Sequence, residues 1–225
     1  MSRASTWAVV PVKALGQAKR RLSRVLPDAA RQRLVLAMLE DVLAAVARVD
    51  AIEGVVVVTP DAHVAELARS RGATIVPEPG ARELNAAIES GIAYVRSRGA
   101  AQALVLPADI PLATSGELGS LIVSRGQRPG VTLAPSHDSN GTNALLLAPP
   151  DAIAACYGAG SYLQHLSQAM ARRVDVNVVH LAGVARDIDE PADLSVLAAA
   201  GRERYGFLDP YLAAGPHRTA AAEEQ

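Results

Sequence analysis

Apolar residues recur along the chain with two different periods, and the two kinds of segment alternate. Between residues 28 and 49, apolar side chains stand three or four positions apart, as on one face of a helix; they are Leu34, Met38, Val42, Ala45 and Val49. Residues 55–58 are instead an unbroken run of valines between Gly54 and Thr59-Pro60. A run that is apolar on both faces is typical of a central strand in a parallel sheet. The pattern therefore predicts amphipathic helices and fully buried strands in one chain.

The same two patterns extend almost to the end of the sequence. We expect strands over residues 7–12, 55–58, 74–76, 103–106, 131–135, 144–148 and 174–181. We expect helices over residues 28–49, 61–71, 83–98, 115–124, 160–173 and 192–200. Alternating strands and helices predict an α/β fold: one three-layer, Rossmann-like domain with a mostly parallel sheet and helices on both faces. Residues 1–205 would form this domain, and residues 206–225, rich in alanine and glutamate, a flexible tail.

Composition narrows the class of protein. The 225 residues carry 22 basic and 23 acidic side chains, a net charge of −1, which favours neither nucleic acid nor a membrane as the main partner. No apolar run is long enough to span a bilayer, and the N-terminus lacks the layout of a signal peptide. The single cysteine, Cys156, excludes an internal disulfide and fits a reducing compartment. We therefore expect a cytoplasmic protein.

A cationic loop follows the first predicted strand. Lys13, Lys19, Arg20 and Arg21 surround Gly16 within nine residues. In open α/β sheets, ligands bind beyond the carboxyl ends of the strands, which selects this loop along with residues 59–61, 77–85 and 108–111. Fixed cations and exposed backbone N–H groups there can hold a triphosphate. The alternative is a solvated basic turn before a helix, and the P-loop pattern is absent.

Carboxylates stand at two places that suit a divalent cation. Asp109 ends a buried strand between two prolines, and Asp187, Asp189 and Glu190 cluster near the C-terminus. Mg²⁺ is usually held by one or two carboxylates, with substrate phosphates and water completing its shell. The alternative is helix capping: Asp109 for the helix that follows it, and Asp189 or Glu190 for the last helix, with Pro191 in its first turn.

Two polar loops offer small side chains, hydroxyls and backbone N–H groups. They are residues 138–143 and residues 158–161, the second ahead of a helix whose positive end would face an anion. The alternative is turn chemistry and an ordinary helix cap, which is favoured for each loop taken singly. The five histidines (His63, His137, His165, His180 and His217) show no metal-ligand spacing, and Cys156 has no basic neighbour in sequence.

Taken together, these segments resemble a known family. The matching residues are Pro11-Val12-Lys13, Ala18-Lys19, Arg21-Leu22, Leu84-Asn85, Ala108-Asp109-Ile110-Pro111, Gly141-Thr142-Asn143, Gly158, Ser161, His165 and Asp187-Ile188-Asp189 before Pro191. In this order they resemble the guanylyltransferases of coenzyme F420 biosynthesis, which act on 2-phospho-L-lactate or phosphoenolpyruvate. The match runs from about residue 7 to residue 200. The resemblance implies a nucleotide-diphosphosugar-transferase-like fold and a Mg²⁺-dependent enzyme that transfers GMP from GTP.

The resemblance also implies roles for individual residues. The triphosphate would contact Lys13, Lys19 and Arg21; the guanine would lie near Leu84 and Asn85; Mg²⁺ would be held by Asp109 and Asp187; the acceptor would be bound by Thr142, Gly158 and Ser161. Whether Asp187 or Asp189 is the second metal ligand stays open, with Asp187 preferred because it precedes the proline by four residues.

The acceptor would be a phosphorylated three-carbon carboxylate: phosphoenolpyruvate, 2-phospho-L-lactate or 3-phospho-D-glycerate. Its phosphate is largely dianionic at neutral pH and can attack the α-phosphorus of GTP without a side-chain base. The alternatives are a cytidylyl- or uridylyltransferase of the same fold and a non-catalytic nucleotide-binding module. The sequence decides neither among the acids nor whether the protein forms a homodimer.

Overall fold

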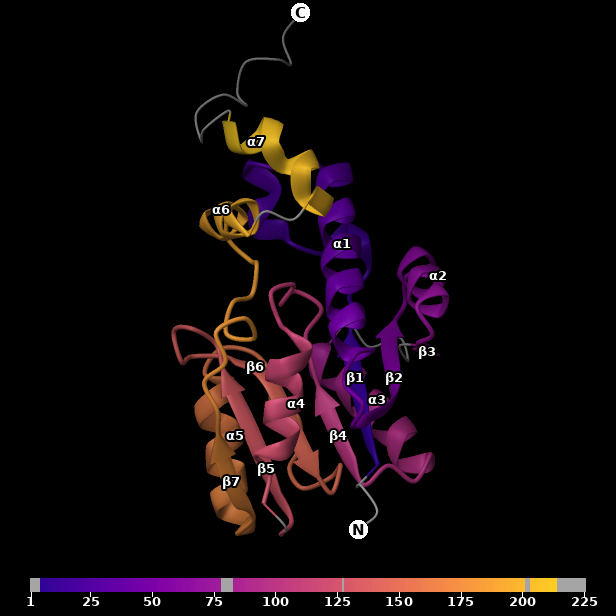
Figure 1. Ribbon diagram of the computed structural model, residues 1–225, viewed down its shortest axis with the longest axis vertical. Helices are drawn as coiled ribbons and strands as arrows, with labels where there is room; N and C mark the ends of the chain where they lie inside the picture. The colour runs from indigo at the N-terminus through magenta and orange to yellow at the C-terminus, as the bar shows by residue number, and fades with distance from the viewer. Residues whose placement is uncertain (1–4, 78–82, 127, 201–202, 214–225) are drawn as a thin grey trace, which may run out of the picture.

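The computed structural model describes residues 5–77, 83–126, 128–200 and 203–213, which build one seven-stranded sheet (Figure 1). The strands are β1 (Thr6–Pro11), β2 (Ile52–Thr59), β3 (Thr74–Pro77), β4 (Gln102–Val105), β5 (Gly130–Pro135), β6 (Thr142–Ala148) and β7 (Asp175–Val178). Their order across the sheet is β3-β2-β1-β4-β6-β5-β7. Only β6 runs against its neighbours in the described sheet; the pairs β1–β2, β1–β4, β2–β3 and β5–β7 are parallel. The predicted α/β fold with a mostly parallel sheet is confirmed.

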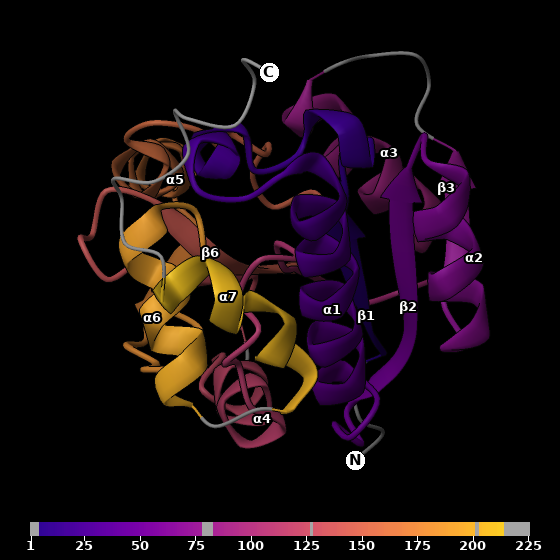
Figure 2. The same ribbon diagram turned by 90° about the horizontal axis from the view of Figure 1, so that it is seen from above.

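Helices cover both faces of the sheet. The α-helices are α1 (Asp28–Val46), α2 (Ala62–Ser70), α3 (Leu84–Ser97), α4 (Ser115–Val123), α5 (Ser161–Arg172), α6 (Pro191–Ala199) and α7 (Asp209–Ala213). Three 3₁₀ segments are η1 (Leu15–Gln17), η2 (Arg20–Arg24) and η3 (Glu203–Leu208). Figure 2 shows α1, α4 and α6 on one side of the sheet and α3 and α5 on the other. None of the helices in the described ranges is long and apolar enough to cross a membrane.

The alternation of side chains along the strands divides the core in two. Ala8 and Val10 of β1 point into the apolar layer beneath α1, whereas Val9 between them packs beneath α3. The same division recurs along β4 and β6. Strands that are apolar on both faces therefore lie between two helical layers, as the valine run predicted.

Gly91 sets how closely α3 approaches the sheet. A Cβ atom at this position would lie 2.4 Å from Cγ1 of Val9, a distance that real side chains do not tolerate. The absence of a side chain lets the α3 backbone pack directly on β1. The first residues of α3 are thereby held near the carboxyl end of the strand.

Most predicted elements are found within one or two residues of their expected ends. The five apolar positions of the first helix are all buried, although the helix ends at Val46 and not at residue 49. The last strand is shorter than predicted: it covers Asp175–Val178, not residues 174–181. The hydrogen-bonded ladder with β5 ends at Val178, so the apolar residues beyond it do not continue the strand.

The C-terminal region differs from its prediction. We expected residues 206–225 to form a flexible tail. Residues 206–213 instead form the end of η3 and α7, and residues 214–225 lie outside the described residues. Tyr205 and Leu208 are buried in the core beside α1 and α6, and the Tyr205 hydroxyl donates to Asp41 Oδ2 at 2.8 Å. The apolar side chains of residues 205–208 thus belong to the domain. A pattern this short and rich in turns gave no periodic signal in the sequence.

Candidate active site

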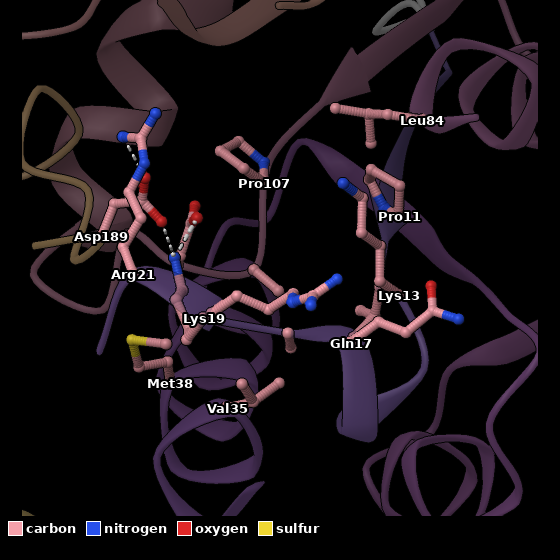
Figure 3. A pocket seen from close by; sticks show the side chains of 15 residues that line it. Pro11, Lys13, Gln17, Lys19, Arg21, Val35, Met38, Leu84, Pro107 and Asp189 are labelled. Carbon is pink, nitrogen blue, oxygen red and sulfur yellow. Dashed lines mark hydrogen bonds and ion pairs between the residues drawn. The ribbon is translucent and has the colours of Figure 1, made fainter. Parts of the chain in front are cut away.

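A cavity of about 390 Å³ opens beyond the carboxyl ends of β1 and β4 (Figure 3). Several residues that the sequence singled out line it: Lys13, Lys19, Arg20, Arg21, Leu84, Asp109 and Asp189. Figure 3 shows Lys13 and Leu84 on one side of the cavity and Lys19, Arg21 and Asp189 on the other. The location agrees with the rule that ligands bind at this edge of an open α/β sheet.

The loop after β1 is anchored from two sides. Its Leu15 N–H donates to Asp61 Oδ2 at 2.9 Å, and the buried Arg31 of α1 donates from Nη1 to the Ala18 carbonyl at 2.9 Å. Lys19 has a left-handed backbone (φ 50°) at the start of η2, and its side chain is only 7% exposed. The loop is therefore not a solvated basic turn around Lys19, because its backbone is anchored and the Lys19 ammonium is buried.

Lys19 joins two carboxylates from distant parts of the chain. Its Nζ lies 2.6 Å from Asp109 Oδ2 and 3.5 Å from Asp189 Oδ1, and Arg21 Nη1 lies 2.8 Å from Asp189 Oδ2. Burial works to lower the pKa of Lys19, but the negative charge and hydrogen bond of Asp109 outweigh it, so the pKa is raised. The ammonium therefore stays charged at neutral pH. We call Lys19, Asp109, Asp187 and Asp189 the charged cluster.

Asp187 is held beside Asp109 without a cation of its own. The Ile188 N–H donates to the Asp109 carbonyl at 2.9 Å, and Asn143 Nδ2 donates to Asp187 Oδ1 at 3.2 Å. Burial, and then the charge of Asp109, raise the pKa of Asp187. Within the described ranges no basic side chain forms an ion pair with this carboxylate, whereas Asp189 has two such partners. Asp187 is thus the carboxylate of the charged cluster whose charge is least compensated.

This donor set fits a divalent cation of the Mg²⁺ type. Mg²⁺ commonly takes one or two protein carboxylates and completes its shell with substrate phosphates and water. No group of three or more acidic, histidine or cysteine side chains placed to hold a metal occurs in the described part of the chain.

The structure shows which of the candidate carboxylates cap a helix. Helix α4 begins at Ser115, and its cap is Thr114, so Asp109 does not cap it. At α6 the cap is Glu190, with Pro191 in the first turn, as the sequence suggested. Asp189 instead remains in the charged cluster. Of Asp187, Asp189 and Glu190, capping therefore accounts for Glu190 alone, which forms a capping box with Asp193.

Thr142, Gly158 and Ser161 come together beside the charged cluster. The Thr142 N–H donates to Ser161 Oγ at 3.0 Å, and the Ser161 N–H donates to the Gly158 carbonyl at 3.1 Å. Gly158 has a φ of +131°, a backbone region that favours glycine. The next residue after Thr142 is Asn143, which reaches Asp187, so the two groups of residues share one strand end. His165 Nδ1 lies 2.9 Å from Thr142 Oγ1, and we call Thr142, Ser161 and His165 the neutral cluster.

The neighbouring residues Leu84 and Asn85 contact different parts of the molecule. Leu84 lines the cavity. Asn85 accepts the Tyr157 N–H at 2.7 Å and donates to the Tyr157 carbonyl at 3.2 Å, so both ends of its amide bind the loop that precedes α5.

Several residues of the site escaped the sequence analysis. Val35 and Met38 of α1 line the cavity, together with Gln17. Arg31 offered a signal: it stands one turn before Leu34 and Val35 on the buried face of an apolar helix, where a charge needs a partner. Asn143 stood in a matching motif, but its contact with Asp187 could not be predicted because it spans 44 residues.

Comparison with known proteins identifies relatives along most of the chain. Residues 6–212 match the family described as guanylyl transferase CofC like. The chain is 41% identical to a phosphoenolpyruvate guanylyltransferase of Sphaerobacter thermophilus over 194 residues, which cover 86% of this chain and 93% of that one. It is 33% identical to a 2-phospho-L-lactate guanylyltransferase of Methanothermobacter thermautotrophicus, with 87% and 85% covered.

A solved structure shares the fold at lower identity. A nucleotidyl transferase from Methanothermobacter thermautotrophicus superposes with a TM-score of 0.64 at 19% identity, covering 87% of this chain and 97% of that one.

Proposed function

Because the chain belongs to the CofC-like guanylyl transferase family, we propose that it transfers GMP from GTP to a small phosphorylated three-carbon carboxylate and releases pyrophosphate, a step of coenzyme F420 biosynthesis. Phosphoenolpyruvate, 2-phospho-L-lactate and 3-phospho-D-glycerate are the candidate acceptors. The observation that carries the proposal is the charged cluster, in which Lys19 Nζ lies 2.6 Å from Asp109 Oδ2 and both residues line the cavity.

The reaction requires two anions to approach each other. An oxygen of the acceptor phosphate, already largely dianionic at neutral pH, attacks the α-phosphorus of GTP. The bond between the α-phosphorus and the oxygen that bridges to the β-phosphorus breaks, and that oxygen leaves with pyrophosphate. Fixed cations offset the repulsion, a task for Lys13, Lys19 and Arg21. Because Lys13 stands across the cavity from the other two, the three side chains can contact a triphosphate along its length.

Asp109 and Asp187 are the proposed ligands of a divalent cation, with Mg²⁺ as the proposed ion. The assignment is supported by the charge of Asp109 acting on Asp187, which has no ion-pair partner within the described ranges. When bound, such an ion would neutralise charge between the two reacting phosphates. Asp189 would hold Lys19 and Arg21 in place.

The remaining site residues are proposed to contact the guanine or the acceptor. Leu84 would pack near the guanine, and Asn85 would support the neighbouring loop. Thr142, Gly158 and Ser161 would bind the acceptor, which is supported by their mutual hydrogen bonds next to Asn143 and Asp187. The cytoplasm is the proposed location, and assembly into a homodimer stays a prediction.

Pyrophosphate release tests the proposal directly. The purified protein is given each of the four nucleoside triphosphates, with Mg²⁺ and each of the three acids in turn. We expect release with GTP and with at least one acid, and none when the acid is omitted. Preference for CTP or UTP would contradict the guanine assignment, and GTP binding without release would identify a non-catalytic module.

A further inference from the structure

His165 is a fully buried histidine that joins two loops of the proposed acceptor site. It lies on α5 and is 0% exposed. Its Nδ1 lies 2.9 Å from Thr142 Oγ1, and its Nε2 accepts the backbone N–H of Cys156 at 3.1 Å. The ring of Tyr157 packs edge-on against the imidazole at 5.2 Å between centroids.

These contacts fix which ring nitrogen carries the proton. A backbone N–H can only donate, so Nε2 must present its lone pair to Cys156. An imidazolium would set two N–H groups against each other at that contact. The imidazole is therefore neutral with its proton on Nδ1, and Nδ1 donates to Thr142 Oγ1.

The tautomer in turn fixes the direction of the Thr142 hydroxyl. Its oxygen accepts from His165, so its own hydrogen must turn elsewhere, and within the described ranges only His165 lies within hydrogen-bonding distance of Oγ1. Ser161 is constrained in the same way, because its Oγ accepts the Thr142 N–H. Both hydroxyls thus keep a hydrogen to donate, and both side chains are buried, 4% exposed at Thr142 and 1% at Ser161, so water is largely excluded from them.

We propose that His165 is a positioning residue that makes the Thr142 hydroxyl a hydrogen-bond donor toward an anionic group of the acceptor acid. The proposal rests on the proposed function, in which Thr142 and Ser161 contact the acceptor. A carboxylate or phosphate oxygen accepts two such hydrogen bonds, whereas an alcohol group offers its own proton and fits less well. His165 thereby contributes to selecting a charged acceptor without touching it.

His165 also holds the loop before α5. Its Nε2 anchors Cys156, and Asn85 clamps the next residue, Tyr157, by both ends of its amide. Gly158 follows directly. A substitution at His165 therefore has two separable effects, one on the Thr142 hydroxyl and one on the loop.

Two replacements separate these effects. In His165→Asn the amide nitrogen can stand near the position of Nδ1 and keep a donor for Thr142, while the acceptor for Cys156 is lost. In His165→Gln the longer side chain can bring an oxygen near the position of Nε2 and keep the loop contact, while the donor is lost. Thr142→Val removes the hydroxyl and keeps the shape. Thermal melting and the KM for GTP report whether each variant is folded.

We expect His165→Gln to raise the KM for the acceptor about tenfold and to leave the KM for GTP unchanged. His165→Asn should keep an acceptor KM closer to that of the wild type. In the Thr142→Val background, His165→Gln should add no further rise. An equal rise in that background, or an equal rise in the KM for GTP, would show that His165 is only structural and would overturn the proposal.

The tautomer can be read without activity. Long-range ¹H–¹⁵N spectra of the wild-type protein labelled at histidine, with His165→Gln to assign the signal, should show a protonated Nδ1 and a bare Nε2 near neutral pH. Observation of a proton on Nε2 would refute the inference whatever the enzyme does. Conversely, the expected tautomer together with an acceptor KM unaffected by Thr142→Val would refute the acceptor site and not the geometry around His165.

Discussion

The charged cluster and the neutral cluster are linked at the start of β6, where Thr142 contacts His165 and Asn143 contacts Asp187, and they differ in whether charge holds them together. In the charged cluster, Asp109 and Asp189 are 30% and 37% exposed, and both form ion pairs with Lys19, at 2.6 and 3.5 Å. In the neutral cluster, His165 is fully buried and uncharged, and order comes from hydrogen bonds whose direction is fixed. An ion pair near water can exchange partners when a substrate arrives, whereas a buried uncharged network must be oriented beforehand. The difference suggests where the site adapts and where it is rigid.

The largest effect is expected in the charged cluster. Asp109→Asn keeps the shape of the side chain and removes the charge that faces Lys19 and Asp187. We expect turnover to fall about 1000-fold, or about 4 kcal/mol of barrier, because charge stabilisation at the reacting phosphates is lost. Steady-state kinetics measure it, with a thermal melt as the control for folding. Near-normal turnover in the folded variant would remove Asp109 from the mechanism.

A pH experiment isolates the neutral cluster. Burial lowers the pKa of His165 from 6.5 to about 4, so the unfolded chain binds more protons than the folded chain between these values. The contribution of His165 to stability is therefore complete above pH 6.5 and declines as the pH falls toward 4, by up to about 3 kcal/mol.

Urea unfolding at pH 7.5 and at pH 5 measures this decline. The wild-type protein should lose more stability between the two values than His165→Gln, in which other groups titrate alike. Equal losses in the two proteins would mean that His165 does not titrate as proposed.

The third prediction compares the loss of charge at Asp187 with the loss of charge at Asp189. Asp187→Asn should lower turnover about 100-fold, and Asp189→Asn only about tenfold, because Lys19 and Arg21 already compensate Asp189. Kinetics over a range of Mg²⁺ concentrations provide the measurement. The reverse ranking would make Asp189 the metal ligand.

The smallest effect is expected at Asn85, which holds the loop before α5. Asn85→Asp keeps the oxygen that accepts the Tyr157 N–H but replaces the donor to its carbonyl, so the loop should loosen and the KM for the acceptor rise about fivefold, or about 1 kcal/mol. Leu84→Ala is the matched variant, and it should instead raise the KM for GTP. If Asn85→Asp weakens GTP more than the acceptor, Asn85 contacts the nucleotide.

Local signals predicted the framework well. The valine run at residues 55–58 marked a central strand because its apolar faces have no other stable location, and three of its four members, Val56–Val58, are fully buried. Asp61 was expected at the start of a helix and caps α2 by accepting the N–H groups of His63 and Val64. Periodicity and caps depend on neighbours within a few residues, so a single sequence contains them.

Contacts between distant residues were out of reach. The hydrogen bond between Asn85 and Tyr157 spans 72 residues, and no local pattern indicates that this amide faces a loop. The burial of Tyr205 beside α1 is similar, because the hydrogen bond from its hydroxyl to Asp41 spans 164 residues. The direction of a hydroxyl proton depends on three such contacts at once, so the neutral cluster emerges only from the folded arrangement.

The reversed direction of β6 has a consequence for how this scaffold can evolve. Because β6 runs against its neighbours, it contributes its first residue, Thr142, at the edge where β1 and β4 contribute their last. The loops before β6 and before α5 can therefore change in sequence while the chain around Lys19 and Asp109 stays intact. Divergence confined to those two loops would let descendants exchange one acceptor acid for another and inherit the same nucleotide donor.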